Sequence, residues 1–148
     1  MSKRDVKLYI VDIFIAVDKI KRYLSSCKDA QALLFDEIRW DATIRELEVI
    51  GEATKHLIEY KVLEDKKYRR IVDFRNQINH GYFGIDEEIV WSVATKKLQE
   101  FYDDLKDIVK MKDVDLNGTI LEIKEEYAHQ KEVQYYLDKL LEEMKVDI

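Results

Sequence analysis

Residues 5–24 read DVKLYIVDIFIAVDKIKRYL, and the apolar side chains of this stretch recur at alternating spacings of four and three positions. An α-helix repeats every 3.6 residues, so this spacing places the side chains along one face. The stretch therefore predicts an amphipathic first helix and favours an all-α fold. The residues of the apolar face are Val6, Ile10, Ile13, Val17, Ile20 and Leu24.

Three further helical segments follow, at residues 33–60, at residues 68–80 and at residues 86–110. Gly51 interrupts the first of them at a cost of about 1 kcal/mol relative to alanine, so we expect a neighbouring backbone to approach closely there. Gly81 stands where a left-handed cap would end the next helix. With the first helix, these segments are sufficient to close a bundle.

The composition also favours long helices with short connections. The chain has 148 residues, 47% of them hydrophobic and 38% charged, with four glycines and no proline. All-β and disordered chains generally carry more of these breaking residues. We expect one domain, an up-and-down bundle of four to five helices in residues 1–110. Residues 111–148 then form a C-terminal extension, with an additional helix from about Ile120 to Met144, packed on the same domain or at an interface.

The formal net charge of -6 means that the whole molecule repels polyanions at long range. A nucleic-acid partner therefore requires a locally basic surface, and residues 66–75, KKYRRIVDFR, supply one. A solvated helix face accounts for the same charges equally well. The RNA-binding candidates in this segment are Lys66, Lys67, Arg69 and Arg70.

The N-terminal residues MSKRDVKLYI lack the apolar region and the cleavage site of a secretory signal. No stretch approaches the roughly 20 apolar residues that span a bilayer. The single cysteine, Cys27, can form no disulfide within the chain. We therefore expect a cytoplasmic protein that does not contact a membrane.

Several kinds of catalytic site lack support in the sequence. The three histidines, His56, His80 and His129, are widely separated, and neither HExxH nor CxxC occurs, so we expect no protein-bound metal. The glycine-rich phosphate loops of Walker and Rossmann proteins are absent, as is the G-x-S-x-G motif of serine hydrolases. We expect no cofactor.

Residues 74–83, FRNQINHGYF, hold the remaining chemistry, because Arg75, His80 and Tyr82 occur together there beside a glycine. Arginine binds phosphate through a permanently charged, bidentate fork, and histidine exchanges protons near neutral pH. The pair can therefore cleave RNA without a metal, since the ribose 2′-hydroxyl is an internal nucleophile that needs only deprotonation and charge stabilisation. DNA lacks that hydroxyl and should resist.

The spacing within the motif limits this interpretation. Arg75 and His80 lie about 140° apart on an ideal helix, so they meet only if the helix ends near His80. Asn79 shares the face of Arg75 and is expected to orient it. A helix cap and a packing group remain the alternative explanation of these residues.

The segment RNQINHGY, residues 75–82, resembles the R-x4-H-x-Y signature of HEPN-domain proteins, and specifically of the HepT-like toxins of toxin-antitoxin pairs. The resemblance extends through residues 4–20, 47–57 (LEVIGEATKHL) and 75–91 in the family's order, and it covers roughly residues 4–110. Relatives often carry a proline and a tryptophan shortly before the motif, where this chain has KKYRRI. The segment after Lys110 is an extension that the family does not explain.

The resemblance implies a HEPN-like helical bundle that forms a homodimer, in which two copies of the motif share one composite cleft. It implies a metal-independent endoribonuclease toxin with Arg75 and His80 as catalytic residues and Asn76 as a supporting polar residue. It also implies an MntA-like nucleotidyltransferase antitoxin that transfers AMP to Tyr82. The added bulk and negative charge would repel RNA from the cleft.

Two other functions stay open at this point. The chain could be a non-catalytic helical accessory or substrate-binding subunit of a nucleotidyltransferase, with the motif kept for contacts. It could also be a helical scaffold whose last helix recruits an unrelated partner. The role of Glu52 is open too, as a partner of Arg75, a partner of another cation, or a polar contact near Gly51.

Overall fold

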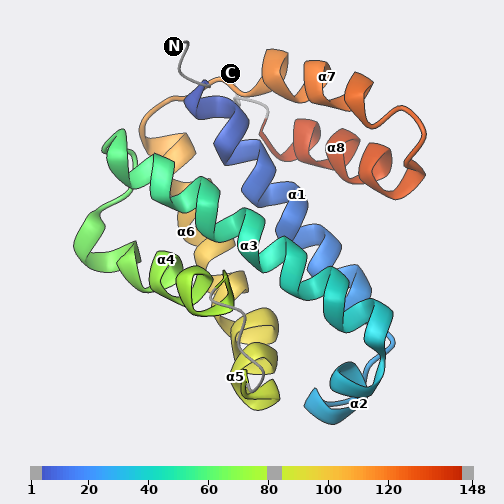
Figure 1. Cartoon of the computed structure of the whole chain (residues 1–148). Coiled ribbons are helices and arrows are strands. Elements are labelled where there is room, and N and C mark those ends of the chain that lie inside the picture. The colour runs from blue at the N-terminus through green and yellow to red at the C-terminus, as the bar shows by residue number, and fades with distance from the viewer. Residues whose placement is uncertain (1–4, 80–84, 145–148) are drawn as a thin grey trace.

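The computed structural model describes residues 5–79 and 85–144, and in these ranges the chain is all-α, which confirms the predicted fold class (Figure 1). A π-helical turn, η1, joins two of the helices. The elements are α1 (Val6–Leu24), α2 (Ala30–Phe35), α3 (Glu37–Glu59), α4 (Asp65–Asn79), α5 (Glu87–Ser92), η1 (Val93–Lys97), α6 (Leu98–Met111), α7 (Asn117–Glu126) and α8 (Lys131–Glu143).

Helix α1 lies at the centre of the bundle. It packs against α3 on one side and against α6, α7 and α8 on the others (Figure 1). The predicted apolar face is buried from Ile10 to Leu24, and the residues between its members are buried as well. The helix is therefore buried around more of its circumference than a single apolar stripe would bury. The additional buried residues are Val11, Phe14, Ile15 and Ala16.

The prediction of one helix over residues 33–60 is wrong at its start. The segment forms two helices, α2 and α3, which are separated at Asp36. A side-chain oxygen of Asp36 accepts a hydrogen bond from the backbone N–H of Arg39 at 3.1 Å and so caps α3. The apolar pattern continues across this break, which is why periodicity alone did not reveal it.

Helix α5, the π turn η1 and α6 follow one another without a break from Glu87 to Met111. Asp86 caps this segment through its side-chain oxygen, which accepts from the N–H of Glu88 at 2.9 Å, as expected for a cap at this position. Val90, Leu98 and Leu105 are all buried in the core.

The prediction of one C-terminal helix from about Ile120 to Met144 is also wrong. The extension forms two helices, α7 and α8, which lie side by side along α1 (Figure 1). The side-chain amide of Gln134 donates to the backbone carbonyl of Tyr127 at 2.9 Å and ties the connection to α8. The side chains that join the extension to the core of the bundle are Ile120, Ile123, Val133, Leu137 and Leu140.

None of the helices described over residues 5–79 and 85–144 is long and apolar enough to cross a membrane.

Candidate functional site

Helices α3 and α4 approach each other closely at Gly51. A Cβ placed on Gly51 would overlap the Cβ of Arg75, and it would lie 2.5 Å from Cγ and 3.5 Å from Cα of the same residue. The absence of a side chain therefore lets the backbone of α4 approach α3 at Arg75. This confirms the expected close approach at Gly51 and identifies α4 as the partner.

The side chain of Arg75 reaches from α4 toward Glu52 on α3 and is 23% exposed. Its Nη1 donates to Asn76 Oδ1 at 3.1 Å, and its Nη2 lies 2.8 Å from Glu52 Oε2. The contact with Glu52 is an ion pair. Arg75 Nε is buried and meets no acceptor among the described residues.

Glu52 has a second neighbour in His56, one helical turn further along α3. Glu52 Oε1 lies 3.2 Å from His56 Nε2, and the other ring nitrogen of His56, Nδ1, lies 3.4 Å from Glu59 Oε2. The imidazole also stacks on the ring of Tyr9 from α1, with centroids 4.5 Å apart and planes inclined by 15°. Arg75 is thus connected through Glu52 and His56 to the central helix.

A hollow of about 250 Å³ opens beside the Arg75–Glu52 pair. Three helices contribute to it, so its shape depends on how α1, α3 and α4 pack. Its charged and polar side chains can contact a polar ligand. One of them, Arg75, belongs to the predicted catalytic pair. The hollow is lined by Tyr9, Asp12, Arg45, Glu48, Val49, Glu52, Ala53 and Arg75.

Two predicted site residues, His80 and Tyr82, lie outside the described residues, so their roles stay predictions. Asn79 is the last residue of α4. Of the residues predicted around the motif, the structure brings together Arg75 and Asn76. It also answers the question that the sequence left open for Glu52, which pairs with Arg75.

The predicted RNA-binding residues lie on the first turns of α4 and are exposed. Lys67 Nζ lies 3.5 Å from Asp104 Oδ2 on α6, and Arg69 Nε donates to Asp65 Oδ1 at 2.6 Å. Both cations are therefore partly neutralised by a neighbouring carboxylate. The role of these residues and of Lys66 and Arg70 in binding RNA stays a prediction.

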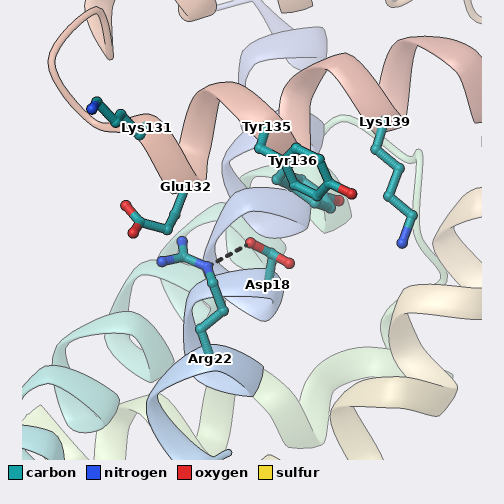
Figure 2. A pocket seen from close by; sticks show the side chains of 7 residues that line it. All are labelled: Asp18, Arg22, Lys131, Glu132, Tyr135, Tyr136 and Lys139. Atoms are coloured by element: carbon teal, nitrogen blue, oxygen red, sulfur yellow. Dashed lines mark hydrogen bonds and ion pairs between the residues drawn. The ribbon is translucent and has the colours of Figure 1, made fainter.

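A second hollow, of about 370 Å³, lies between α1 and α8 (Figure 2). Arg22 Nε donates to Asp18 there at 3.0 Å, and Figure 2 shows Lys131 and Lys139 extending from opposite ends of the helix face. The hydroxyl of Tyr136 is paired with that of Tyr102 at 2.9 Å. The cations of this hollow do not converge on one point, so we do not include it in the candidate site.

Within residues 5–79 and 85–144, His, Cys, Asp and Glu side chains form no group of three arranged to hold a metal ion.

Sequence reasoning missed the part of the site that lies on α3. The sequence pattern assigns no role to His56, and it leaves the role of Glu52 open. Glu52 directly follows Gly51, and His56 follows Glu52 by four residues. This spacing was the available signal for the part of the site on α3. On a helix this spacing puts both side chains on one face, the face that the glycine brings near α4.

Comparisons with known proteins agree on one family. The model of the ribonuclease HepT-like family matches residues 13–110, which end within α6, so that α7 and α8 lie outside the match. "Putative RNase MJ0127" of Methanocaldococcus jannaschii is 32% identical over 117 residues, which cover 74% of this chain and 92% of the relative. "Probable ribonuclease HepT" of Thermococcus cleftensis is 29% identical over 103 residues, covering 65% of this chain and 88% of the relative. No solved structure matches the chain.

Proposed function

The chain belongs to the HepT-like ribonuclease family, and from this premise we propose that it is a metal-independent endoribonuclease whose substrate is RNA. The observation that carries the proposal is the position of Arg75. This residue occupies the arginine of the R-x4-H-x-Y motif, packs on Gly51, and lines a hollow with Glu52 beside it. A positive group held at the edge of a hollow suits contact with a phosphodiester.

In the proposed reaction the ribose 2′-hydroxyl attacks the adjoining phosphorus. His80 takes up the proton of the 2′-hydroxyl and passes it to the departing 5′-oxygen, and Arg75 stabilises the negative charge that develops on the phosphoryl oxygens. The bond to the 5′-oxygen breaks, and that oxygen leaves with a proton. Asn76 accepts a hydrogen bond from Arg75 and supports it, which fits the proposed supporting role. Two copies of the chain would combine their motifs in one cleft.

Regulation of the site forms a second part of the proposal. An MntA-like nucleotidyltransferase would neutralise this toxin by transferring AMP to Tyr82. The adduct would add bulk and negative charge to the motif, and so would oppose the approach of RNA. Intact-mass analysis of the chain co-expressed with an MntA-like nucleotidyltransferase tests this, with Tyr82→Phe as the variant that should gain no adduct.

RNA cleavage by the purified protein in EDTA is the direct test of the activity. We expect the wild type to cut a single-stranded RNA and to leave the DNA of the same sequence intact. Arg75→Ala and His80→Ala should each reduce cleavage by at least about 100-fold, because each removes a group that acts on the reacting atoms. Equal cleavage by all three proteins would identify a contaminating nuclease and remove the assignment.

Expression in cells separates this function from the non-catalytic alternative. A toxin should arrest growth when expressed alone, and the arrest should disappear with His80→Ala. An accessory subunit of a nucleotidyltransferase would be harmless in both forms. We expect arrest by the wild type only.

A further inference from the structure

The orientation of Arg75 depends on a residue from another helix. Asn76, which accepts from Nη1, is its neighbour in the chain and moves with α4. Glu52, which lies 2.8 Å from Nη2, belongs to α3. Of these two polar contacts, only the one with Glu52 therefore fixes the guanidinium relative to the rest of the bundle.

Glu52 is itself held by contacts on both carboxylate oxygens. Oε2 faces Arg75, and Oε1 lies 3.2 Å from His56 Nε2. The ring of His56 is fixed by its stacking on Tyr9 and by Glu59 on its other nitrogen. With both ring nitrogens beside carboxylates, the ring can donate to both only as the imidazolium. The side chains of His56 and Glu52 thus form a connection from α1 across α3 to Arg75 on α4.

The charge of Glu52 indicates what this connection does. A carboxylate beside the guanidinium repels an RNA phosphate and does not assist binding. Its contribution is therefore to the geometry of Arg75, and misplacing a catalytic group by about 1 Å can cost a rate factor of about 100. Loss of Glu52 should then lower turnover without weakening the binding of RNA.

We propose that Glu52 and His56 are positioning residues, which hold Arg75 in the orientation from which it contacts the scissile phosphate of RNA. This inference rests on the proposed ribonuclease function and adds two residues from outside the R-x4-H-x-Y motif. Glu52 contacts Arg75 directly, and His56 acts through Glu52. Neither residue contacts the reacting atoms.

Steady-state cleavage of a labelled RNA oligonucleotide tests the proposal at Glu52. Glu52→Gln keeps the length of the side chain and removes its charge. We expect kcat to fall by about 10- to 100-fold and KM to stay constant or decrease. Glu122→Gln is the matched control, since it removes an exposed carboxylate on α7, outside the hollow. Its kcat should stay within about twofold of the wild type, an effect of the size that distant surface charges have.

Two variants test the role of His56. His56→Gln keeps a nitrogen donor where Nε2 lies, whereas His56→Phe keeps the stacking on Tyr9 and loses the donor. We expect His56→Phe to lower kcat by about tenfold and His56→Gln to restore most of it. A purely structural role, in which only packing on Tyr9 matters, predicts the opposite order and would overturn this part of the proposal.

Nuclear magnetic resonance of the Arg75 side chain gives a readout that needs no activity. The Nε–H signal, assigned by its loss in Arg75→Lys, should exchange with solvent faster in Glu52→Gln than in the wild type. An unchanged exchange rate overturns the positioning role. If the wild type cleaves RNA and Glu52→Gln has the same kcat, the positioning role alone is overturned. If the wild type does not cleave RNA, the ribonuclease function is overturned.

Discussion

At the scale of single residues, Gly51 matters because of the atoms that it lets approach. Gly51→Ala gains about 1 kcal/mol of helix propensity, but the new methyl group would overlap the Cβ of Arg75. Overpacking of this kind costs about 1–3 kcal/mol, and here the obstacle is attached directly to the backbone of α4. We expect the cost to lie in the upper part of this range, which leaves a net loss of about 1–2 kcal/mol in the free energy of unfolding, measured by urea denaturation.

Gly118 is the matched control for this change, because a Cβ there meets nothing within 4 Å. Gly118→Ala should leave stability unchanged or raise it slightly. If Gly51→Ala were as stable as the wild type, the close contact of α3 with α4 at Arg75 would be wrong. The contact itself was predictable in part: a glycine within a helix indicates a close neighbour, but the identity of that neighbour depends on how the helices pair in space.

At the scale of elements, the positions where helices are interrupted were the least predictable. Asp36 divides the predicted helix at residues 33–60, and Tyr127 ends α7 inside the predicted C-terminal helix. Leu33 and Trp40 are seven residues apart and keep one face across the first break, so the pattern carries no mark of it, whereas the spacing widens to six residues between Tyr127 and Val133 and so marks the second. The first helix was predictable because a continuous buried stripe determines it.

Helix α3 also carries a carboxylate whose ionisation opposes folding. Burial raises the pKa of Glu46 above its ordinary value, although the positive charge of Lys19 partly offsets this. The folded chain therefore binds this proton more tightly than the unfolded chain, and the stability contributed by the group is lost as pH rises through the folded pKa. Glu46→Gln should raise the free energy of unfolding at pH 7 by less than about 1 kcal/mol.

The gain from Glu46→Gln should disappear near pH 4, where the wild-type carboxyl is protonated in the folded chain. Urea denaturation at the two pH values measures the difference, and Glu48→Gln controls for the loss of one negative charge from the same helix. A gain that does not change with pH would mean that burial of Glu46 is not its cause.

At the scale of the whole molecule, the C-terminal extension shares the core of the bundle. The buried hydroxyls of Tyr102 on α6 and Tyr136 on α8 form a hydrogen bond at 2.9 Å, and Lys106 Nζ donates to Glu143 at 3.0 Å. The prediction that residues 111–148 form an extension on the same domain leads to a test. Tyr136→Phe leaves the Tyr102 hydroxyl buried without a partner and should cost about 1–3 kcal/mol.

The double variant Tyr102→Phe/Tyr136→Phe removes both hydroxyls and should recover most of that loss. Thermal unfolding followed by circular dichroism measures both effects. We expect one cooperative transition that shifts as a whole. A transition that splits, with only its minor part affected by Tyr136→Phe, would show that the extension folds as a separate unit.

The π turn η1 makes the packing of its neighbouring helices depend on the number of residues in this region. Val90 and Leu98 are both buried, yet residues eight positions apart differ by about 80° in direction on a regular α-helix. The wider turn at residues 93–97 corrects this difference in phase and lets both side chains point inward. Removing one residue there would rotate α5 away from its contact with α2. This segment should therefore accept a change of side chain more readily than a change in the number of residues.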